Sequence, residues 1–276
     1  FFGTVLGYFK MMLMSSVLGM VVLSYHRIIT TPPGFVPRGW KPSDIHEDEA
    51  EEVMEKFRRM DSDSIDSKER QKLREEVKHF KYRYCVKCDA FKPPRSHHCR
   101  ECKACVLRMD HHCPWVNNCV GHYNHKYFIV FLLWGLVGIG YGALMLLVKV
   151  GWMLKNISDG VPHNMTPIQG IIIISNFCLI LPMSLGMLSL LVYHLELAAT
   201  NTTTIEYNDR IIAMKEARRN KREYQWPYDF GWKQNLSLFF GKSTILWCLP
   251  VPSDRWNFDP CHYPTVPISP TLELIA

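Results

Sequence analysis

Charged side chains are missing from two long stretches of this 276-residue sequence. No Asp, Glu, Lys or Arg occurs between Phe128 and Val148 or between Ile168 and Tyr193. A helix needs about 20 apolar residues to cross a hydrocarbon core about 30 Å thick, and both runs are long enough. This absence of charge excludes an ordinary soluble core over these stretches and predicts two transmembrane helices.

A third apolar stretch, Phe1 to Tyr25, carries a single charged residue, Lys10. It lacks the basic leader and the small-residue cleavage pattern of a signal peptide, so we expect it to be a third span. The sequence thus predicts an all-α integral membrane bundle with three spans.

The link between the last two spans lacks Lys and Arg after Lys155 and contains two glycosylation sequons, at Asn156 and Asn164. Basic residues are instead concentrated after the last span, from Arg210 to Arg222. Loops rich in Lys and Arg remain in the cytosol. We therefore predict a luminal link and a cytosolic C-terminal region, with chance as the alternative explanation of the sequons.

Cysteine is concentrated in one segment, where seven of the ten cysteines lie between Cys85 and Cys119. Several form Cys-x-x-Cys pairs, and this gap lets both thiolates reach one tetrahedral Zn²⁺ at about 2.3 Å. Two closed sites, each of three cysteines and one histidine, would use six thiols and leave one. The count does not identify it, but Cys113 alone has two histidines directly before it and an acidic residue before those.

The run Asp110-His111-His112-Cys113-Pro114-Trp115, with Asn117-Asn118-Cys119-Val120-Gly121 after it, resembles the core of the DHHC protein S-acyltransferases. These palmitoyltransferases transfer a fatty acyl group from acyl-CoA to cysteine thiols. The resemblance implies a cytosolic zinc-binding domain of short β-hairpins and loops with two structural zinc ions. One zinc would be bound by Cys85, Cys88, His98 and Cys105, and the other by Cys99, Cys102, His112 and Cys119.

The same resemblance implies that Cys113 is the nucleophile. A free thiol has a pKa of about 8.5, so attack on a thioester needs a base or a lowered pKa. We expect His111 to be the base and Asp110 to orient it by accepting a hydrogen bond from its far ring nitrogen. Cys113 would take the acyl group from palmitoyl-CoA, and a substrate cysteine would then remove it. The competing hypothesis is a catalytically inactive, zinc-containing membrane adaptor.

Two residues are candidates for contact with the acyl chain. Trp115 would line an acyl pocket, although a tryptophan beside a membrane is more often an interfacial anchor. Gly138 leaves room for an acyl chain along its helix, although small residues more often permit close helix packing.

Other segments also resemble the family. Pro33-Gly34 matches part of an Asp-Pro-Gly motif, with Pro32 where aspartate is usual. A Thr-Thr-x-Glu motif that packs near the active site, and a C-terminal motif with an asparagine, are matched by Thr203, Thr204, Glu206 and Asn235. Turn and cap chemistry is the alternative role for these residues.

Gly34-Phe35-Val36-Pro37 and Gly39-Trp40-Lys41-Pro42 resemble the subgroup whose longer members carry a C-terminal SH3-like domain. The family usually has at least four spans, whereas this sequence has three and begins with phenylalanine. We therefore expect an N-terminally truncated chain that lacks its first helix.

Between Tyr82 and Lys126 there are eight Lys or Arg and three Asp or Glu. This excess suits anionic headgroups and the phosphates of CoA. Basic zinc modules also bind nucleic acid, but the adjacent spans argue against nucleic acid here. We expect acyl-CoA, the lipid bilayer and membrane-associated proteins with cytosolic cysteines as partners, at the endoplasmic reticulum or Golgi with the active site facing the cytosol.

Residues 43–81 carry thirteen acidic and nine basic side chains. We expect a solvent-exposed insertion of variable structure, with charged helices at Glu49–Met60 and Ser67–Phe80, that acts as a linker or recruits a protein. The expected organisation is transmembrane helices at 1–30, 127–155 and 168–199, a cytosolic charged insertion or linker at 31–81, the zinc-binding catalytic domain at 82–126, a luminal loop at 156–167 and a cytosolic C-terminal region at 200–276.

Overall fold

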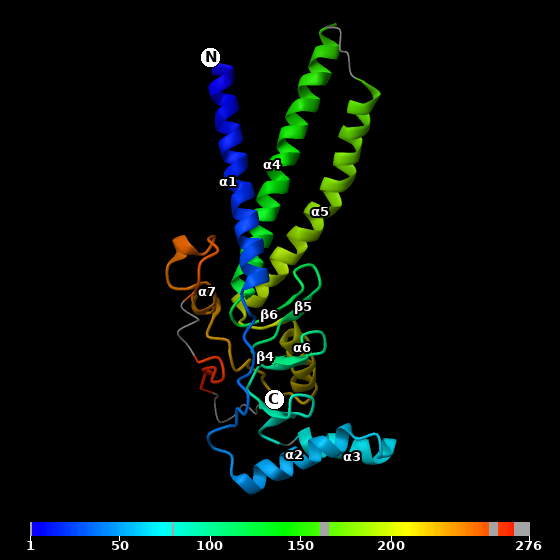
Figure 1. Cartoon of the computed structure of the whole chain (residues 1–276), viewed down its shortest axis with the longest axis vertical. Coiled ribbons are helices and arrows are strands. Elements are labelled where there is room, and N and C mark those ends of the chain that lie inside the picture. The colour runs from blue at the N-terminus through cyan, green and yellow to red at the C-terminus, as the bar shows by residue number, and fades with distance from the viewer. Residues whose placement is uncertain (1, 79, 161–165, 254–258, 268–276) are drawn as a thin grey trace. The chain divides into compact units, whose positions relative to one another are not determined.

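The computed structural model describes residues 2–78, 80–160, 166–253 and 259–267 (Figure 1). The sequon residue Asn164 and the end of the tail, 268–276, lie outside these ranges. The chain forms two compact units. The first comprises 1–27, 126–196 and 243–251, and the second comprises 28–125, 197–242 and 252–276.

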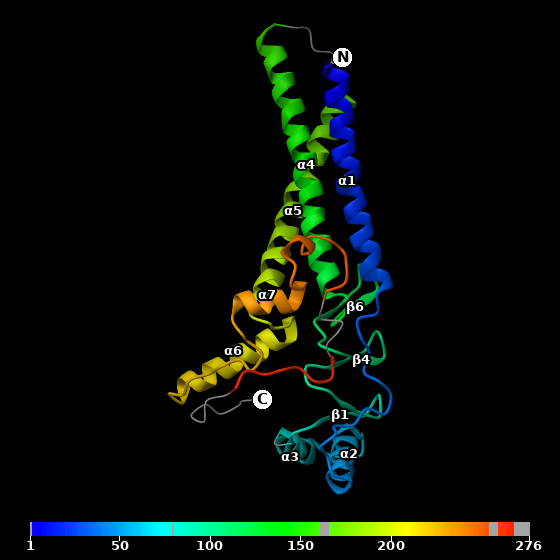
Figure 2. The same ribbon diagram turned by 90° about the vertical axis from the view of Figure 1, so that its left-hand side faces the viewer.

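The first unit consists mainly of three long helices: α1 (Phe2–Thr30), α4 (His125–Ser158) and α5 (Pro167–Ala199). Each is long and apolar enough to cross a membrane, as the charge-free stretches predicted (Figures 1 and 2). Most of their large apolar side chains are exposed. Exposure of so much apolar surface to water is unfavourable, so this pattern is the one expected of helices that face lipid.

Close packing between α1 and α4 involves a glycine. A Cβ atom on Gly138 would lie 3.5 Å from Cγ1 of Val17, and the rings of Tyr25 and Phe131 lie 5.5 Å apart. Gly138 therefore lies where two helices approach each other, which supports close helix packing as its role. The unit also includes the short 3₁₀ helix η1 (Thr244–Leu246).

The second unit contains the expected short hairpins, three in number within the described residues. β1 (Arg83–Cys85) pairs with β2 (Ala90–Lys92), β3 (His97–Cys99) with β4 (Ala104–Val106), and β5 (His111–Cys113) with β6 (Asn118–Val120). The first strands begin 14 residues apart, at positions 83, 97 and 111. A residue with positive φ recurs at the same place in each turn, at Asp89, Lys103 and Asn117. One hairpin design is thus repeated three times.

The segment that follows α1 lies against these hairpins. Phe35 forms a β-bridge with Val106, and the backbone N–H of Leu107 donates to the carbonyl of Gly34 at 2.8 Å. Gly34 has φ of 97°, a conformation that strongly favours glycine, and a Cβ there would make a tight contact of 3.1 Å with the Tyr123 ring. The Pro33-Gly34 motif therefore attaches the end of α1 to the hairpins.

The charged insertion forms α2 (Glu47–Asp61) and α3 (Ser67–Lys78), close to the predicted helices. We expected it to be solvent-exposed and variable, but α2 buries Ala50 and Val53 in a cluster with Tyr84 and Phe91 of the first hairpin. The prediction of solvent exposure is therefore wrong for Ala50 and Val53, although most of the insertion is exposed or half-buried.

A helical stripe of apolar residues explains this docking. Ala50, Val53, Met54 and Phe57 recur at positions i, i+3, i+4 and i+7, which places them on one face of α2. The high charge of the whole segment concealed this pattern. The insertion is consequently a packed part of the hairpin unit.

Replacing Val53 with aspartate should detach α2 from the first hairpin, because Val53 is fully buried and a carboxylate there would have to be desolvated. We expect faster proteolysis within residues 43–81 and a loss of about 2–5 kcal/mol in the free energy of unfolding. Glu51→Asp, at an exposed position of the same helix, is the control and should leave both unchanged. Equal proteolysis of the two variants would contradict the docked arrangement.

Two further helices, α6 (Thr204–Arg219) and α7 (Trp232–Phe240), complete the second unit. Asn235 of α7 is buried, and its side-chain Nδ2 donates to the carbonyl of Ala199 at 2.8 Å. Its Oδ1 accepts from the backbone N–H of Phe230 at 3.0 Å. The asparagine thus satisfies an orphan carbonyl at the end of α5 and holds the preceding loop, which is the cap chemistry considered as an alternative for this motif.

Candidate active site and metal clusters

Two groups of side chains in the hairpins could each hold a metal ion. The ligand atoms within each group all lie within 4.8 Å of one another. The first group is Cys85, Cys88, His98 and Cys105, and the second is Cys99, Cys102, His112 and Cys119. These are the two sets that the family resemblance implied.

The spacing of the ligand atoms matches a tetrahedral zinc ion. His112 Nδ1 lies 3.6 Å from Cys99 Sγ and 3.5 Å from Cys102 Sγ, and the Cys102 and Cys119 sulfurs are 3.5 Å apart. Zn–S bonds of about 2.3 Å and Zn–N bonds of about 2.0 Å at tetrahedral angles require edges of about 3.5 Å between nitrogen and sulfur and about 3.8 Å between two sulfurs. The first group is somewhat less regular, with His98 Nδ1 at 3.2 Å from Cys88 Sγ and 4.0 Å from Cys105 Sγ. Both groups fit the ion.

Strand register explains how successive hairpins share these clusters. His98 lies opposite Cys105 in the second hairpin, and His112 lies opposite Cys119 in the third. Each of these pairs is completed by a Cys-x-x-Cys turn from the preceding hairpin. A cluster therefore requires two adjacent hairpins, and it holds them together.

Cys113 occupies in the third hairpin the position that Cys85 and Cys99 occupy in the first two. The residue three positions later is Val116 instead of a second cysteine. No fourth hairpin follows within the described residues to supply a histidine and a third thiol. The repeat thus leaves Cys113 outside both groups, with its thiol available for chemistry.

The alternation of side chains along β5 separates the neighbours of Cys113. In a strand, residues two apart lie on one face and the residue between them lies on the other. His111 and Cys113 therefore share one face, while His112 points to the opposite face and joins the second cluster. This three-residue strand thus contributes His112 to the second candidate metal group and places His111 beside Cys113 on its other face.

Asp110 is buried and forms a hydrogen bond with the Nδ1 atom of His111. Its Oδ2 lies 2.7 Å from His111 Nδ1, and because a carboxylate only accepts, the Nδ1 atom carries the hydrogen. This leaves Nε2 for the hydrogen bond between His111 and Cys113. The backbone N–H of Thr204 donates to Asp110 Oδ1 at 2.9 Å, and the Thr204 hydroxyl donates to Oδ2 at 2.8 Å. The Thr-Thr-x-Glu motif therefore orients the aspartate.

The electrostatic environment favours a charged pair of His111 and Cys113. Burial alone would raise the pKa of Cys113, but hydrogen bonds from His111 and from the backbone N–H groups of Val116 and Trp115 lower it below its usual value. Burial opposes a charge on His111 too, yet its hydrogen bonds with Asp110 and Cys113 raise the pKa of the imidazole to about 9. Both shifts favour an imidazolium next to a thiolate, the reactive form of a cysteine nucleophile.

The first turn of α6 is fixed by a capping box and a buried ion pair. Thr203 accepts from the backbone N–H of Glu206, and the Glu206 carboxylate accepts from the backbone N–H of Thr203. The same carboxylate receives two hydrogen bonds from Arg95, each 2.7 Å long. This bidentate pair joins the second hairpin to the helix that carries Thr204.

Replacing Arg95 with leucine should be strongly destabilising because it leaves the Glu206 carboxylate buried without the guanidinium that pairs with it. We expect a loss of about 3–5 kcal/mol in the free energy of unfolding, measured by denaturation in detergent. Lys41→Leu, which breaks an exposed pair with Glu47, should cost less than about 1 kcal/mol. Equal losses would show that the Arg95 pair contributes no more than a surface contact.

Neither of the two candidate acyl-contact residues, Trp115 and Gly138, lies in an enclosed pocket described for this structure. Trp115 is 84% exposed and lies in the turn after Cys113, so its ring is not enclosed in the second unit. Gly138 lies at the contact between α1 and α4. Neither arrangement adds support to an acyl-binding role.

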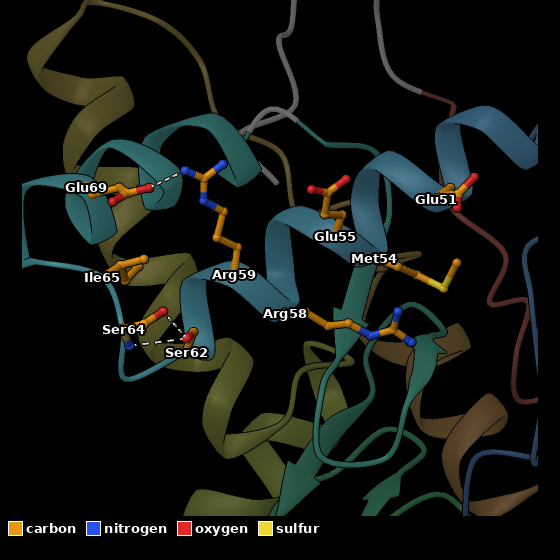
Figure 3. A pocket seen from close by; sticks show the side chains of 9 residues that line it. All are labelled: Glu51, Met54, Glu55, Arg58, Arg59, Ser62, Ser64, Ile65 and Glu69. Carbon is orange, nitrogen blue, oxygen red and sulfur yellow. Dashed lines mark hydrogen bonds and ion pairs between the residues drawn. The ribbon is translucent and has the colours of Figure 1, made fainter.

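An open pocket of about 720 Å³ lies between α2 and α3. Its lining is mostly charged, and Figure 3 shows Arg59 paired with Glu69 while the hydroxyls of Ser62 and Ser64 meet. None of the predicted site residues lines it. A charged, open lining of this kind is unsuited to an acyl chain.

Several residues that contact the site were missed by sequence reasoning. Arg108 and His125 are fully buried, and the Arg108 Nη1 lies 3.3 Å from His125 Nδ1. Tyr263, in a tail that held no recognised motif, contacts His122 through its hydroxyl and places its ring under the Arg95 guanidinium. Arginines inside a cysteine-rich segment were read only as surface charge, and nothing in the tail marked Tyr263.

Comparisons with known proteins match this chain to one family model and to several similar proteins. A family model described as DHHC palmitoyltransferase matches residues 78–211. The chain is 36% identical over 169 residues to Probable protein S-acyltransferase 16 of Arabidopsis thaliana, covering 61% of this chain and 58% of that protein. It is 38% identical over 253 residues to Palmitoyltransferase PFA4 of Mycosarcoma maydis, covering 90% of this chain and 51% of that protein.

A third relative is covered more fully. Probable protein S-acyltransferase 13 of Arabidopsis thaliana is 34% identical over 235 residues, which cover 84% of this chain and 68% of that protein. The chain thus spans little more than half the length of the first two relatives and about two thirds of the third.

Proposed function

This chain belongs to the DHHC palmitoyltransferase family, and on that premise we propose that it is a protein S-acyltransferase. It would move a long-chain acyl group such as palmitoyl from acyl-CoA to cysteines of other proteins. The observation that carries the proposal is the thiol of Cys113, which lies outside both metal clusters and next to a histidine held by a buried aspartate.

In the first step, Nε2 of His111 takes the thiol proton and the Cys113 sulfur attacks the thioester carbon of acyl-CoA. The bond from that carbon to Cys113 forms, the bond to the CoA sulfur breaks, and the imidazolium returns its proton to the CoA thiolate. In the second step, His111 takes the thiol proton of a substrate cysteine, and that sulfur attacks the acyl carbon. The bond from this carbon to the Cys113 sulfur breaks, and Cys113 is released as a thiolate beside the imidazolium. Each step exchanges one thioester for another, so no ATP is needed.

Asp110 acts through His111. It fixes the ring with Nε2 toward Cys113 and stabilises the imidazolium, while its contacts with Thr204 keep the carboxylate in place. Zinc in the two clusters would hold the thiolates and fold the hairpins, without entering the reaction.

We further propose that α1, α4 and α5 cross an endomembrane of the endoplasmic reticulum or Golgi with the hairpins in the cytosol. The exposed apolar helices and the basic residues after α5 support this orientation. Acyl-CoA would then approach the basic hairpins from the cytosol, and membrane-associated proteins with cytosolic cysteines would be the acceptors.

The test is acyl loading in lipid vesicles. The reconstituted protein is incubated with labelled palmitoyl-CoA, and the label on the protein is measured before and after hydroxylamine, which cleaves thioesters. A hydroxylamine-labile label supports the proposal. A protein that folds and binds zinc but takes up no label would instead be the inactive adaptor.

A further inference from the structure

Asn201 lies in the link between α5 and α6 and is almost fully buried. Its φ is 48°, a conformation that asparagine tolerates better than most residues. Its backbone N–H donates to the carbonyl of Ala198, and the next N–H, of Thr202, donates to the carbonyl of Leu197. These two bonds form a Schellman cap at the end of α5.

The side chain of Asn201 does more than this cap requires. Its Oδ1 accepts from Arg95 Nη1 at 3.2 Å and from Arg108 Nη2 at 3.4 Å. Its Nδ2 donates to the carbonyl of Tyr228 at 2.8 Å. One buried amide therefore connects two hairpin arginines to the loop before α7.

The two arginines lead in turn to the reactive pair. Arg95 pairs with Glu206, which closes the capping box of α6. Arg108 Nη1 donates to His125 Nδ1, so the hydrogen of His125 is on Nε2. This Nε2 atom lies 3.9 Å from Asp110 Oδ1. The contacts of Arg95 thus lead to the first turn of α6, which binds Asp110 through Thr204. The contacts of Arg108 lead to His125, which faces Asp110.

We propose that Asn201 is a positioning residue for acyl transfer, an inference that rests on the proposed function. It sets the link between α5 and α6 against Arg95 and Arg108, so that Thr204, three residues later, meets the carboxylate of Asp110 with both its N–H and its hydroxyl. Asp110 then holds His111 against Cys113. Asn201 touches no reacting atom and acts only through this chain of contacts.

Replacing Asn201 with glycine separates this role from helix capping. Glycine is the preferred residue at the left-handed position of a Schellman cap, so the variant keeps the cap and loses only the amide. We expect the rate of acyl loading on Cys113 to fall about 10- to 100-fold, because small misplacements of reacting groups have effects of this size. The KM for acyl-CoA, the zinc content and the melting temperature should stay close to wild type.

Two further variants provide the controls. Asn201→Asp keeps the oxygen between the two arginines and tolerates positive φ, so it should restore at least half of the loading rate lost in Asn201→Gly. Asn220→Gly makes the same chemical change at the exposed end of α6 and should load at the wild-type rate.

A double-mutant cycle with Thr204→Val tests the route. If Asn201 acts through Thr204, Asn201→Gly should slow loading by less than about threefold in the Thr204→Val background. Full additivity, or wild-type loading by Asn201→Gly, would overturn the inference while leaving the proposed function intact. A loss of zinc and of melting temperature together with activity would also overturn it, in favour of a purely structural role. An unlabelled wild-type protein overturns the proposed function and this inference with it.

Discussion

Acyl loading is expected to disappear when Cys113 is replaced with serine. Serine keeps the size of a residue that is only 6% exposed, so the hairpin should fold as before. Its hydroxyl ionises far less readily than a thiol, and His111 as base would not activate it enough for attack on a thioester. We expect loading to fall at least about 1,000-fold, as is typical when the nucleophile of a catalytic unit is removed.

The controls are another cysteine and the metal content. Cys248 is exposed and lies outside both metal clusters, so Cys248→Ser should load normally. Both variants should contain the same amount of zinc as wild type, measured by elemental analysis. If Cys113→Ser still acquired a hydroxylamine-labile label, another thiol would be the nucleophile and the assignment of Cys113 would fail.

The second large effect is expected from the metal clusters. Cys88 and Cys102 stand at equivalent positions of the first and second hairpins, one in each cluster. A structural zinc site contributes on the order of 10–16 kcal/mol to folding, which is comparable to the whole stability of a typical domain, about 5–15 kcal/mol. Removing one ligand should therefore unfold the hairpins that share that cluster.

We expect Cys88→Ala and Cys102→Ala each to contain fewer than two zinc ions and to lose their cooperative melting transition, because the second hairpin contributes ligands to both clusters. Acyl loading should be lost in Cys102→Ala because the second cluster contains His112, the neighbour of Cys113. Cys261→Ala is the control, since Cys261 is buried but belongs to neither cluster, and it should keep both metal ions. Two zinc ions in either ligand variant would contradict the ligand sets.

The third hairpin explains why the Cys113 thiol belongs to neither candidate metal cluster. Its first strand repeats the histidine and cysteine positions of the second hairpin, since His111-His112-Cys113 aligns with His97-His98-Cys99. The turn that follows has Val116 where a second metal-binding cysteine would stand. A position that belongs to a candidate metal cluster in the first two hairpins is therefore left as a thiol beside a histidine in the third.

Much of this arrangement follows from local sequence. Two charge-free stretches and a third with a single charge predicted the three long helices, because hydropathy is a property of the segment itself. The grouping of cysteines and histidines predicted metal sites, because ligand spacing over a few residues determines which side chains reach one ion. The hairpins and the two ligand sets were implied by the family resemblance.

Contacts between distant segments were decided only by packing. Thr204 meets Asp110 across 94 positions, and Glu206 meets Arg95 across 111. The family resemblance implied that the Thr-Thr-x-Glu motif packs near the active site. It did not indicate which buried polar groups face each other, since that depends on how α6 packs against the hairpins. The docking of α2 on Tyr84 and Phe91 likewise depended on a four-residue apolar stripe within a strongly charged segment. Short motifs therefore indicated the type of chemistry, whereas the residues that orient the reacting groups were identified only from contacts between buried polar side chains in the folded structure.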